Sequence, residues 1–311
     1  MLILSCASKL QLLETLLKRN LPQTVAVYGA VVNINRGNPV GHEVIVDSWP
    51  DCKAVLTRPR TEADTDNTDL YKNIYAAFYW DLDVYRRLLL DTDAVNWKQN
   101  FRLYGKRQFF LRENPYVQKQ TGFLLATYSG CWPVLTCVGL DDLSQKGGSW
   151  VLPTSLSILF LPVISSRLDP SFTISTLQSS HVDILNETWP HGGNEQSRRF
   201  LDNMVKCFPS ICILDSNGHP ISWSIMDPLG AQIHGYTLPS HRRRGYLAIV
   251  MRALSMQIHA AGCPVYGHTA LNNVQTQNLL DYMVLPKVTG WQWWPIFFGT
   301  MGIFANLIKC H

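Results

Sequence analysis

The chain has 311 residues, of which 46% are hydrophobic and 16% charged, and its formal net charge is +4. This is the composition of a globular protein, long enough for two domains with buried cores. The small positive charge does not argue for a nucleic-acid partner, although it suits a small anionic ligand. The eight cysteines include no Cys-x-x-Cys pair, so we expect reduced, buried thiols and neither a zinc site nor a disulfide framework.

The N-terminal part is expected to alternate helices and short strands. Ser8-Lys-Leu-Gln11 has the pattern of a capping box, and leucines follow at helical spacing, which favours a helix over residues 8–19 rather than a targeting presequence. Strands are expected at residues 25–33, 43–46 and 54–57, a loop at 62–69, and one or two helices at 71–90. We attribute the aromatic residues of that last segment to core packing.

Residues 106–165 show the least regular pattern of the chain. They contain Gly147-Gly148 and scattered prolines, and only residues 156–161 indicate a buried strand. We interpret residues 106–150 as a divergent insertion or a wrongly joined exon. A linker and a strand are again expected at 167–180, so the domain boundary is placed near residue 165, giving domains 1–165 and 166–311.

The second domain is expected to form a mixed α/β sheet. A helix is predicted before Gly192-Gly193 and another at 198–207, followed by a hairpin of strands 211–214 and 221–226 around Asp215-Ser-Asn-Gly218. Further on, the predicted elements are a strand at 233–238, a helix from Gly245 to Gly262, a strand at 265–271, a helix at 273–285 and a strand at 288–294.

The most apolar stretch is at residues 291–308. It is shorter than the roughly 20 apolar residues that a membrane span requires, and it carries one proline and two glycines. We therefore expect a final buried strand and a tail, with a membrane-surface contact as the less favoured alternative.

The stretch 231–262 places Arg242-Arg-Arg-Gly245 where a strand delivers the chain into a helix. The first N–H groups of a helix have no intrahelical partner and carry partial positive charge, so a loop entering a helix is suited to bind pyrophosphate. Gly245 permits close backbone approach, and the arginines add charge-assisted hydrogen bonds. A solvated basic turn before an ordinary helix is the alternative interpretation.

Arg242 and Gly245 match the acyl-CoA-binding pattern Gln/Arg-x-x-Gly-x-Gly/Ala of the GCN5-related N-acetyltransferase superfamily, although Leu247 stands where a small residue is usual. More specific segments resemble the glycine N-acyltransferase family. They lie at 27–29, 33–39, 46–50, 96–99, 191–200, 207–210, 220–223, 226–227, 235–239 and 264–266. The resemblance implies two tandem acyl-CoA N-acyltransferase-like domains of mixed α/β fold, with the complete coenzyme A site only in the second.

The activity implied by this resemblance is transfer of an acyl group from acyl-CoA to the amino group of glycine, which gives N-acylglycine and CoA. Acyl-CoA is then a co-substrate, and we expect no permanent cofactor, no metal, a monomer and a mitochondrial location, with the cytoplasm or endoplasmic reticulum as alternatives. The expected CoA-binding residues are Tyr236, Thr237, Leu238, Arg242, Arg243, Arg244, Gly245, Tyr246, Leu247, Ala248 and, for the pantetheine arm, Asn273. Main-chain N–H groups near Tyr236 to Leu238 are expected to polarise the thioester carbonyl.

The family's general base is a glutamate in the strand before the Gly-x-Thr-Leu-Pro segment, and the matching position here is Ala231. His234 follows in the same strand, and alternation with period two is expected to bring its ring to the same face, where a histidine can serve as base. His268 is a weaker candidate, and Tyr282 is expected to protonate the CoA sulfur. Two alternatives stay open: an acyl-CoA-binding protein without catalysis, and an N-acyltransferase for another amine, such as a protein lysine.

Overall fold

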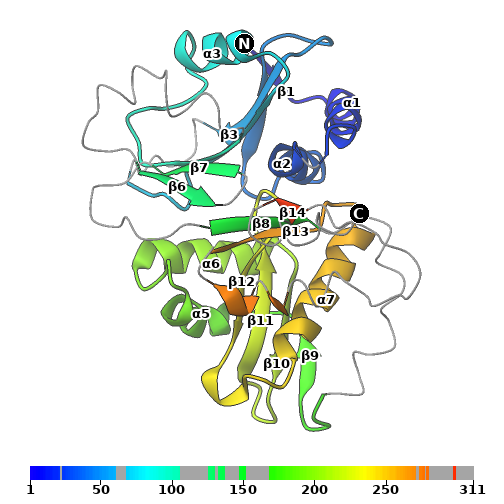
Figure 1. The fold of residues 1–311 in the computed structure, drawn as a ribbon, viewed down its shortest axis with the longest axis vertical. Coiled ribbons are helices and arrows are strands. Elements are labelled where there is room, and N and C mark those ends of the chain that lie inside the picture. Colours follow the sequence, from blue (N-terminus) through cyan, green and yellow to red (C-terminus); the bar gives the residue numbers. More distant parts are fainter. Residues whose placement is uncertain are drawn as a thin grey trace, which may run out of the picture. The chain divides into compact units, whose positions relative to one another are not determined.

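The computed structural model describes residues 1–21, 23–60, 68–105, 125–129, 132–136, 147–151, 168–270, 273–276, 278–279 and 297–298. The chain divides into two compact units (Figure 1). Unit 1 comprises Met1–Trp150, His268–Val274 and Phe297–His311, and unit 2 comprises Val151–Gly267 and Gln275–Ile296. The boundary predicted near residue 165 lies outside the described residues.

Unit 1 contains a mixed sheet with helices packed on it. Its strands follow the order β1 (Leu2–Leu4), β2 (His42–Val46), β3 (Ala54–Pro59), β4 (Ile74–Tyr79), β5 (Arg102–Tyr104), β7 (Trp132–Thr136), β6 (Leu125–Ser129) and β8 (Gly147–Val151, of which Val151 is assigned to unit 2), with β14 (Phe297–Phe298) paired to β8. The β4–β5 and β6–β8 pairs are parallel and the others antiparallel. The helices are α1 (Ala7–Lys18), α2 (Val25–Asn35) and α3 (Leu82–Leu90). The predicted first helix and the strands β2 and β3 are confirmed.

Two predictions in unit 1 were wrong. Residues 25–33, expected to be a strand, form α2, whose residues from Val25 to Val32 are all buried between α1 and the strands β2 to β4. A helix that is buried on every side shows no polar face, and its valines then suggest a strand. Residues 71–90, expected to be entirely helical, contain the fully buried strand β4, and only α3 is a helix.

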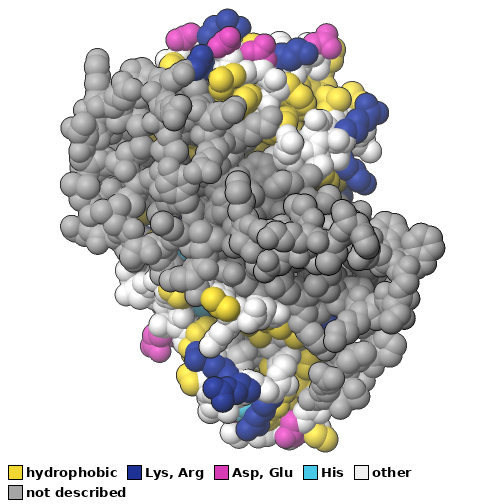
Figure 2. Space-filling view, in the orientation of Figure 1, with side chains coloured by type: hydrophobic (Ala, Val, Ile, Leu, Met, Phe, Trp, Pro, Cys, Tyr) yellow, Lys and Arg dark blue, Asp and Glu magenta, His cyan; other side chains and the backbone are white. Residues whose placement is uncertain are grey.

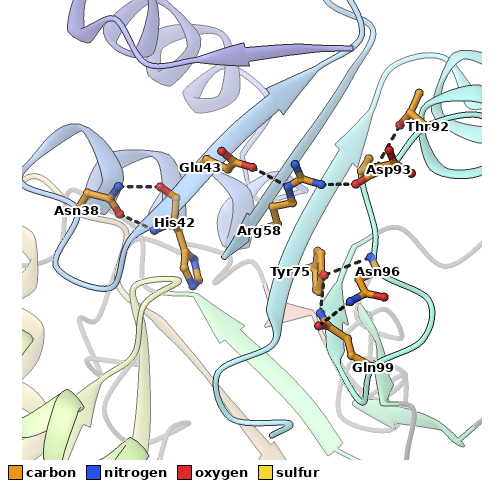
Figure 3. A network of polar contacts seen from close by, with 10 residues as sticks. Asn38, His42, Glu43, Arg58, Tyr75, Thr92, Asp93, Asn96 and Gln99 are labelled. Carbon is orange, nitrogen blue, oxygen red and sulfur yellow. Dashed lines mark hydrogen bonds and ion pairs between the residues drawn. The ribbon is translucent and has the colours of Figure 1, made fainter. Parts of the chain in front are cut away.

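A buried polar network connects the strands of unit 1 to its loops (Figure 3). Arg58 Nε donates to Glu43 Oε1 at 2.7 Å, with side chains 7% and 13% exposed, and Arg58 Nη1 donates to the carbonyl of Asp93. The Tyr75 hydroxyl accepts hydrogen bonds from Gln99 Nε2 at 2.6 Å and from the main-chain N–H of Asn96 at 3.4 Å. These groups satisfy one another, so we assign the network a structural role.

Unit 2 carries a second mixed sheet, in the order β9 (Thr173–Ser175), β10 (Ser210–Leu214), β11 (Pro220–Met226), β12 (Ala231–Thr237) and the first two residues of β13 (Tyr266–Ala270), whose remaining residues are assigned to unit 1. Its neighbours are antiparallel except for the parallel pair β12–β13. The helices α5 (Val182–Thr188) and α6 (Glu195–Cys207) lie on one side of the sheet, and α7 (Tyr246–Ala260) lies on the other (Figure 1). Two mixed sheets confirm the α/β class and the tandem organisation expected from the sequence.

The elements predicted between residues 198 and 271 are confirmed, including the β10–β11 hairpin and the strand–loop–helix of β12 and α7. The strands expected at 156–161 and 288–294 lie outside the described residues, as do most of the helix at 273–285 and the apolar stretch at 291–308. Within the described part of the chain, no helix combines the length and the apolar character needed to cross a membrane.

Candidate functional site

The loop between β12 and α7 has the geometry that its sequence predicts. After a short 3-10 turn at Pro239–His241, the backbone turns through left-handed positions at Arg243 (φ 65°) and Gly245 (φ 80°), and Gly245 is the N-cap of α7. A left-handed N-cap favours glycine, because other residues adopt this conformation only with strain. The unpaired N–H groups of the first turn of α7 therefore follow directly on the arginine cluster.

The three arginines do not have equal roles. Arg242 Nε donates to the carbonyl of Thr237 at 3.1 Å and Nη2 to the Tyr236 hydroxyl at 3.1 Å, so this guanidinium ties the loop back to β12. All three arginines are exposed, and basic side chains gather on the visible surface of unit 2 (Figure 2), but Arg242 is held by these two hydrogen bonds. Arg243 and Arg244 are therefore the arginines best placed for phosphate contacts, while Arg242 also shapes the loop.

A segment that the sequence analysis missed packs against this loop. Leu168 and Phe172 contact the apolar cluster at the start of α7, and the Phe172 ring lies 5.8 Å from the Tyr246 ring and 5.9 Å from the His241 ring. Asp169 accepts hydrogen bonds from Ser171, which lowers the pKa of its carboxyl, and the charge of Arg244 lowers it further. Only the local spacing of apolar residues before β9 could have indicated this contact.

The ladder between β12 and β13 ends early. It consists of Ala231 opposite Tyr266 and Gln232 opposite Gly267, and no described residue of β13 pairs with β12 beyond Gln232. Beyond Gln232 the described residues therefore provide no ladder partner on this edge of β12, which leads directly into the arginine loop. A strand edge without a ladder partner can hold an extended ligand through main-chain hydrogen bonds.

The main-chain N–H groups expected to polarise a thioester differ in their availability. The N–H of Leu238 donates to the carbonyl of Ile221 at 2.9 Å, so it is occupied and cannot serve. Because hydrogen-bond directions alternate along a strand, the N–H of Thr237 points to the opposite edge, where no described residue continues the ladder. Thr237 is therefore the donor that this geometry favours.

A β-bulge in β12 determines where His234 lies. Trp223 pairs with Tyr236 and Ile225 with Ile233, so β12 has one additional residue between these pairs, and His234 adopts φ 53°. Gln232 Nε2 donates to Ser255 Oγ of α7, whereas His234 Nε2 bonds the Leu185 carbonyl of α5. By alternation, Ala231 lies on the α5 face opposite Gln232, and His234 joins it there through the bulge. The two residues are three positions apart, so regular alternation would place them on opposite faces and the reason given from the sequence was wrong; the bulge is what brings His234 to the α5 face.

His234 is enclosed by aromatic rings on the α5–α6 side of the sheet. Its ring stacks on Trp189 at 5.6 Å and meets the edge of Trp223 at 6.0 Å, while Nε2 lies 2.7 Å from the Leu185 carbonyl. Burial lowers the pKa of His234 to about 4, although the hydrogen bond to Leu185 opposes this shift. His234 is therefore neutral at physiological pH.

Position 231 provides no carboxylate. Ala231 is fully buried, and the nearest acidic residue along the strand, Asp227, accepts hydrogen bonds through Oδ1 from the N–H groups of Leu229 (2.9 Å) and Ala231 (2.8 Å). Asp227 thus shapes the turn before β12. On this face the described residues of β12 offer the imidazole of His234 as a candidate proton acceptor.

The other predicted residues lie in different environments, and one lies outside the described part of the chain. Burial lowers the pKa of His268 to about 4, and Asn273 is exposed. Tyr282 lies outside the described residues. Cys212 and Cys263 are buried, and burial raises the pKa of Cys212 to about 12, as expected of core thiols. Among the residues that the structure describes, no group of three or more His, Cys, Asp or Glu side chains could hold a metal ion.

Comparison with known proteins gives a consistent result. The family described as aralkyl acyl-CoA:amino acid N-acyltransferase matches residues 1–209, and its C-terminal region matches residues 211–297. The chain is 32% identical over 295 residues to glycine N-phenylacetyltransferase of Bos taurus, covering 92% of this chain and 95% of that protein. Glycine N-acyltransferase of Bos taurus is 31% identical over 299 residues, covering 94% and 98%.

Among solved structures, the X-ray structure of a Drosophila protein aligns with a TM-score of 0.67 at 16% identity, over 94% of this chain and 95% of that chain, which supports the fold. The family matches cover both halves of the chain and confirm the resemblance seen in its motifs. The chain therefore belongs to the aralkyl acyl-CoA:amino acid N-acyltransferase family and is an acyltransferase.

Proposed function

We propose that this acyltransferase moves the acyl group of an acyl-CoA to the amino group of glycine, releasing N-acylglycine and CoA. The observation that carries the proposal is that the edge of β12 without a described ladder partner runs into the loop at Arg243 and Gly245 and then into the N-terminus of α7. A pantetheine arm suits the strand edge, and a pyrophosphate suits the loop and the helix N-terminus. The relatives named above, which act on glycine, support the acceptor.

In this mechanism the amine nitrogen attacks the thioester carbon directly. The carbonyl oxygen becomes an oxyanion, which accepts a hydrogen bond from the N–H of Thr237, and a single donor of this kind can contribute about 3 kcal/mol. The nitrogen loses a proton, the carbon–sulfur bond breaks, and the CoA thiolate takes up a proton to leave as the thiol. Tyr282 is our proposed donor of that last proton.

His234 is the proposed proton acceptor for the amine. A base with a pKa of about 4 is unprotonated throughout the physiological range, but it is too weak to take a proton from the amine before the attack on the carbonyl. The amine nitrogen becomes a much stronger acid once it has attacked the carbonyl, so a weak base suffices at that stage. His234 therefore acts first by accepting a hydrogen bond from the amine and then by accepting its proton.

The test is CoA release from a panel of acyl-CoA donors, measured with and without glycine. We expect release that depends on glycine for at least one donor, with the N-acylglycine identified by mass spectrometry. Tight acyl-CoA binding without turnover on any amine would overturn the proposal and indicate a binding protein.

A second candidate acceptor is favoured by one observation. The position that corresponds to the family's catalytic glutamate is the buried Ala231, and the neighbouring Asp227 is engaged by main-chain N–H groups. An acceptor peptide can bring a proton-accepting side chain next to its lysine amine, so it needs less help from a base on the enzyme. Faster CoA release with lysine-containing peptides than with glycine would favour this acceptor.

The proposed location is the mitochondrion, on the family resemblance alone. Subcellular fractionation of cells that express the full chain with a C-terminal tag tests it. Recovery with the cytosolic or endoplasmic reticulum fraction would contradict it.

A further inference from the structure

Three aromatic rings stack from α6 to β12 in unit 2. Phe200 lies 5.8 Å from Trp189 with an angle of 13° between the ring planes, and Trp189 lies 5.6 Å from His234 with an angle of 19°. Trp223 of β11 meets the same imidazole at 82°. The imidazole is thus covered on one face by Trp189 and bounded by Trp223.

The segment that carries Trp189 is held by hydrogen bonds on both sides. Asn186 Oδ1 accepts from the N–H of Gly193 at 3.0 Å and from Ser197 Oγ at 2.6 Å, and Asn186 Nδ2 donates to the carbonyl of Asn194 at 3.3 Å. A Cβ added to Gly192 would lie 2.4 Å from the carbonyl oxygen of Asn186, so the chain is closely packed there. The turn between α5 and α6 therefore presents Trp189 from a fixed backbone.

The hydrogen bond of His234 defines its tautomer. A main-chain carbonyl can only accept, so the contact of 2.7 Å between Nε2 and the Leu185 oxygen requires the hydrogen on Nε2. In a neutral ring the lone pair is then on Nδ1. Fixing the protonated nitrogen through a carbonyl is the arrangement that leaves the other nitrogen available as an acceptor.

We propose that Trp189 and the Leu185 carbonyl are the positioning elements of this acyltransferase, holding His234 in the Nε2–H tautomer with Nδ1 free to accept from the acceptor amine. This inference rests on the proposed role of His234. Trp189 acts by preventing rotation of the ring and by excluding water from one of its faces. Nothing in the mechanism requires Trp189 to touch the substrate.

Among the residues that the structure describes, few charged groups face the His234 ring. His191, in the same turn and 5.9 Å from the Trp189 ring, lowers the pKa of His234 slightly further by its positive charge. On α5 and α6, Asp183 and Arg198 form an exposed ion pair with each other at 2.7 Å. From the strands, the neighbour is the aromatic side chain of Trp223, whose ring in turn lies 5.3 Å from that of Tyr236. Water exclusion therefore dominates the environment of the imidazole.

The first test reads the tautomer without any activity. The full chain is labelled with ¹⁵N-histidine, and the His234 signals among its nine histidines are assigned by comparison with His234→Gln. We expect an unprotonated Nδ1 and a protonated Nε2 at pH 7. A protonated Nδ1, or equal populations of both tautomers, overturns the proposal whether or not the enzyme acylates glycine.

The second test compares variants across pH. Trp189→Ala opens the imidazole to water and moves its pKa upward toward the ordinary value near 6.5. The ratio of kcat/KM of the variant to that of the wild type is then expected to fall by up to about tenfold between pH 8 and pH 5.5. The reason is that the His234 imidazole becomes protonated in this range only in the variant. Taking the ratio cancels the titration of the glycine amine.

Two further variants separate positioning from damage to the fold. Trp189→Phe keeps an aromatic face on the imidazole and is expected to keep a flat ratio. Phe200→Leu disturbs the other face of Trp189 and serves as the control for damage to the fold. It is expected to lower thermal stability and to leave the kcat/KM ratio independent of pH. A flat ratio for Trp189→Ala, or an equal slope for Phe200→Leu, contradicts the positioning role. If Trp189→Ala does not fold, the test rests on Trp189→Phe. A kcat/KM ratio that falls between pH 8 and pH 5.5 for Trp189→Phe then contradicts the positioning role.

Discussion

His234 is placed to accept a proton but is a weak base, so its removal is expected to lower the catalytic rate only moderately. We expect His234→Ala to lower kcat for glycine acylation by about 10²-fold, at the low end of general-base effects, with acyl-CoA affinity unchanged. Stopped assays of N-acylglycine with calorimetric titration of CoA measure both quantities. An unchanged kcat would show that the amine loses its proton to solvent.

The complementary change is Ala231→Glu in the His234→Ala background. A carboxylate there lies on the same face of β12, so we expect partial recovery of kcat. The recovery is limited because Ala231 is fully buried, and a larger, charged side chain must displace its neighbours. The same assay checks it, with the thermal midpoint of each variant as control for folding.

The arginine loop between β12 and α7 depends most on the backbone conformation of Gly245. At φ 80° a valine is strained, so we expect Gly245→Val to weaken CoA binding more than Arg243→Ala, which removes one exposed charge. Gly218, at φ 81° in the β10–β11 hairpin, is the matched control, because an added Cβ meets no atom within 4 Å at either glycine. Gly218→Val should lower stability and leave CoA affinity unchanged, as measured by calorimetry. Equal losses for Gly245→Val and Arg243→Ala would contradict the backbone role.

At the scale of elements, β2 and β3 are tied together by the buried pair of Glu43 and Arg58. Removing one partner leaves an uncompensated buried charge, so we expect Glu43→Gln to lower the free energy of unfolding by about 3 kcal/mol. Asp202→Asn, which breaks the more exposed pair with Lys206 on α6, is the control and should cost less than about 1 kcal/mol. Urea denaturation monitored by circular dichroism compares the two.

The elements that could be predicted from sequence are those with local signals. The hairpin of β10 and β11, the glycine at the start of α7 and its apolar face all follow from residues close in the chain. Helix α2 and strand β4 could not be predicted, because complete burial removes the polar face from the first and the alternation from the second. In the site, the arginine loop was predictable, whereas the bulge that turns His234 depends on pairing with β11. Trp189 and Phe172 were missed because only tertiary packing brings them to the site.

For the whole molecule, buried neutral histidines make stability depend on pH. Burial lowers the pKa of His42, in unit 1, to about 4, against an unfolded value near 6.5. The unfolded chain therefore binds more protons between these values, and stability is lost as the pH falls from about 6.5 to about 4. At pH 5 this residue alone accounts for about 2 kcal/mol, so His42→Asn should reduce the difference in unfolding free energy between pH 7 and pH 5 by that amount. An unchanged difference would show that His42 is hydrated in the folded state.

The hydrogen bonds of Asn186 have a consequence for producing the protein. Asn186-Glu-Thr188 has the sequence of an N-glycosylation acceptor, and a chain directed into the secretory pathway would be offered to the glycan transferase before it folds. In the folded chain the amide nitrogen of Asn186 donates to the carbonyl of Asn194, and its oxygen is also engaged, so a sugar on that nitrogen would occupy the place of the α5–α6 turn. Secreted expression is therefore expected to yield folded molecules without sugar and misfolded ones with it, and Asn186→Gln would remove the sugar while weakening the turn.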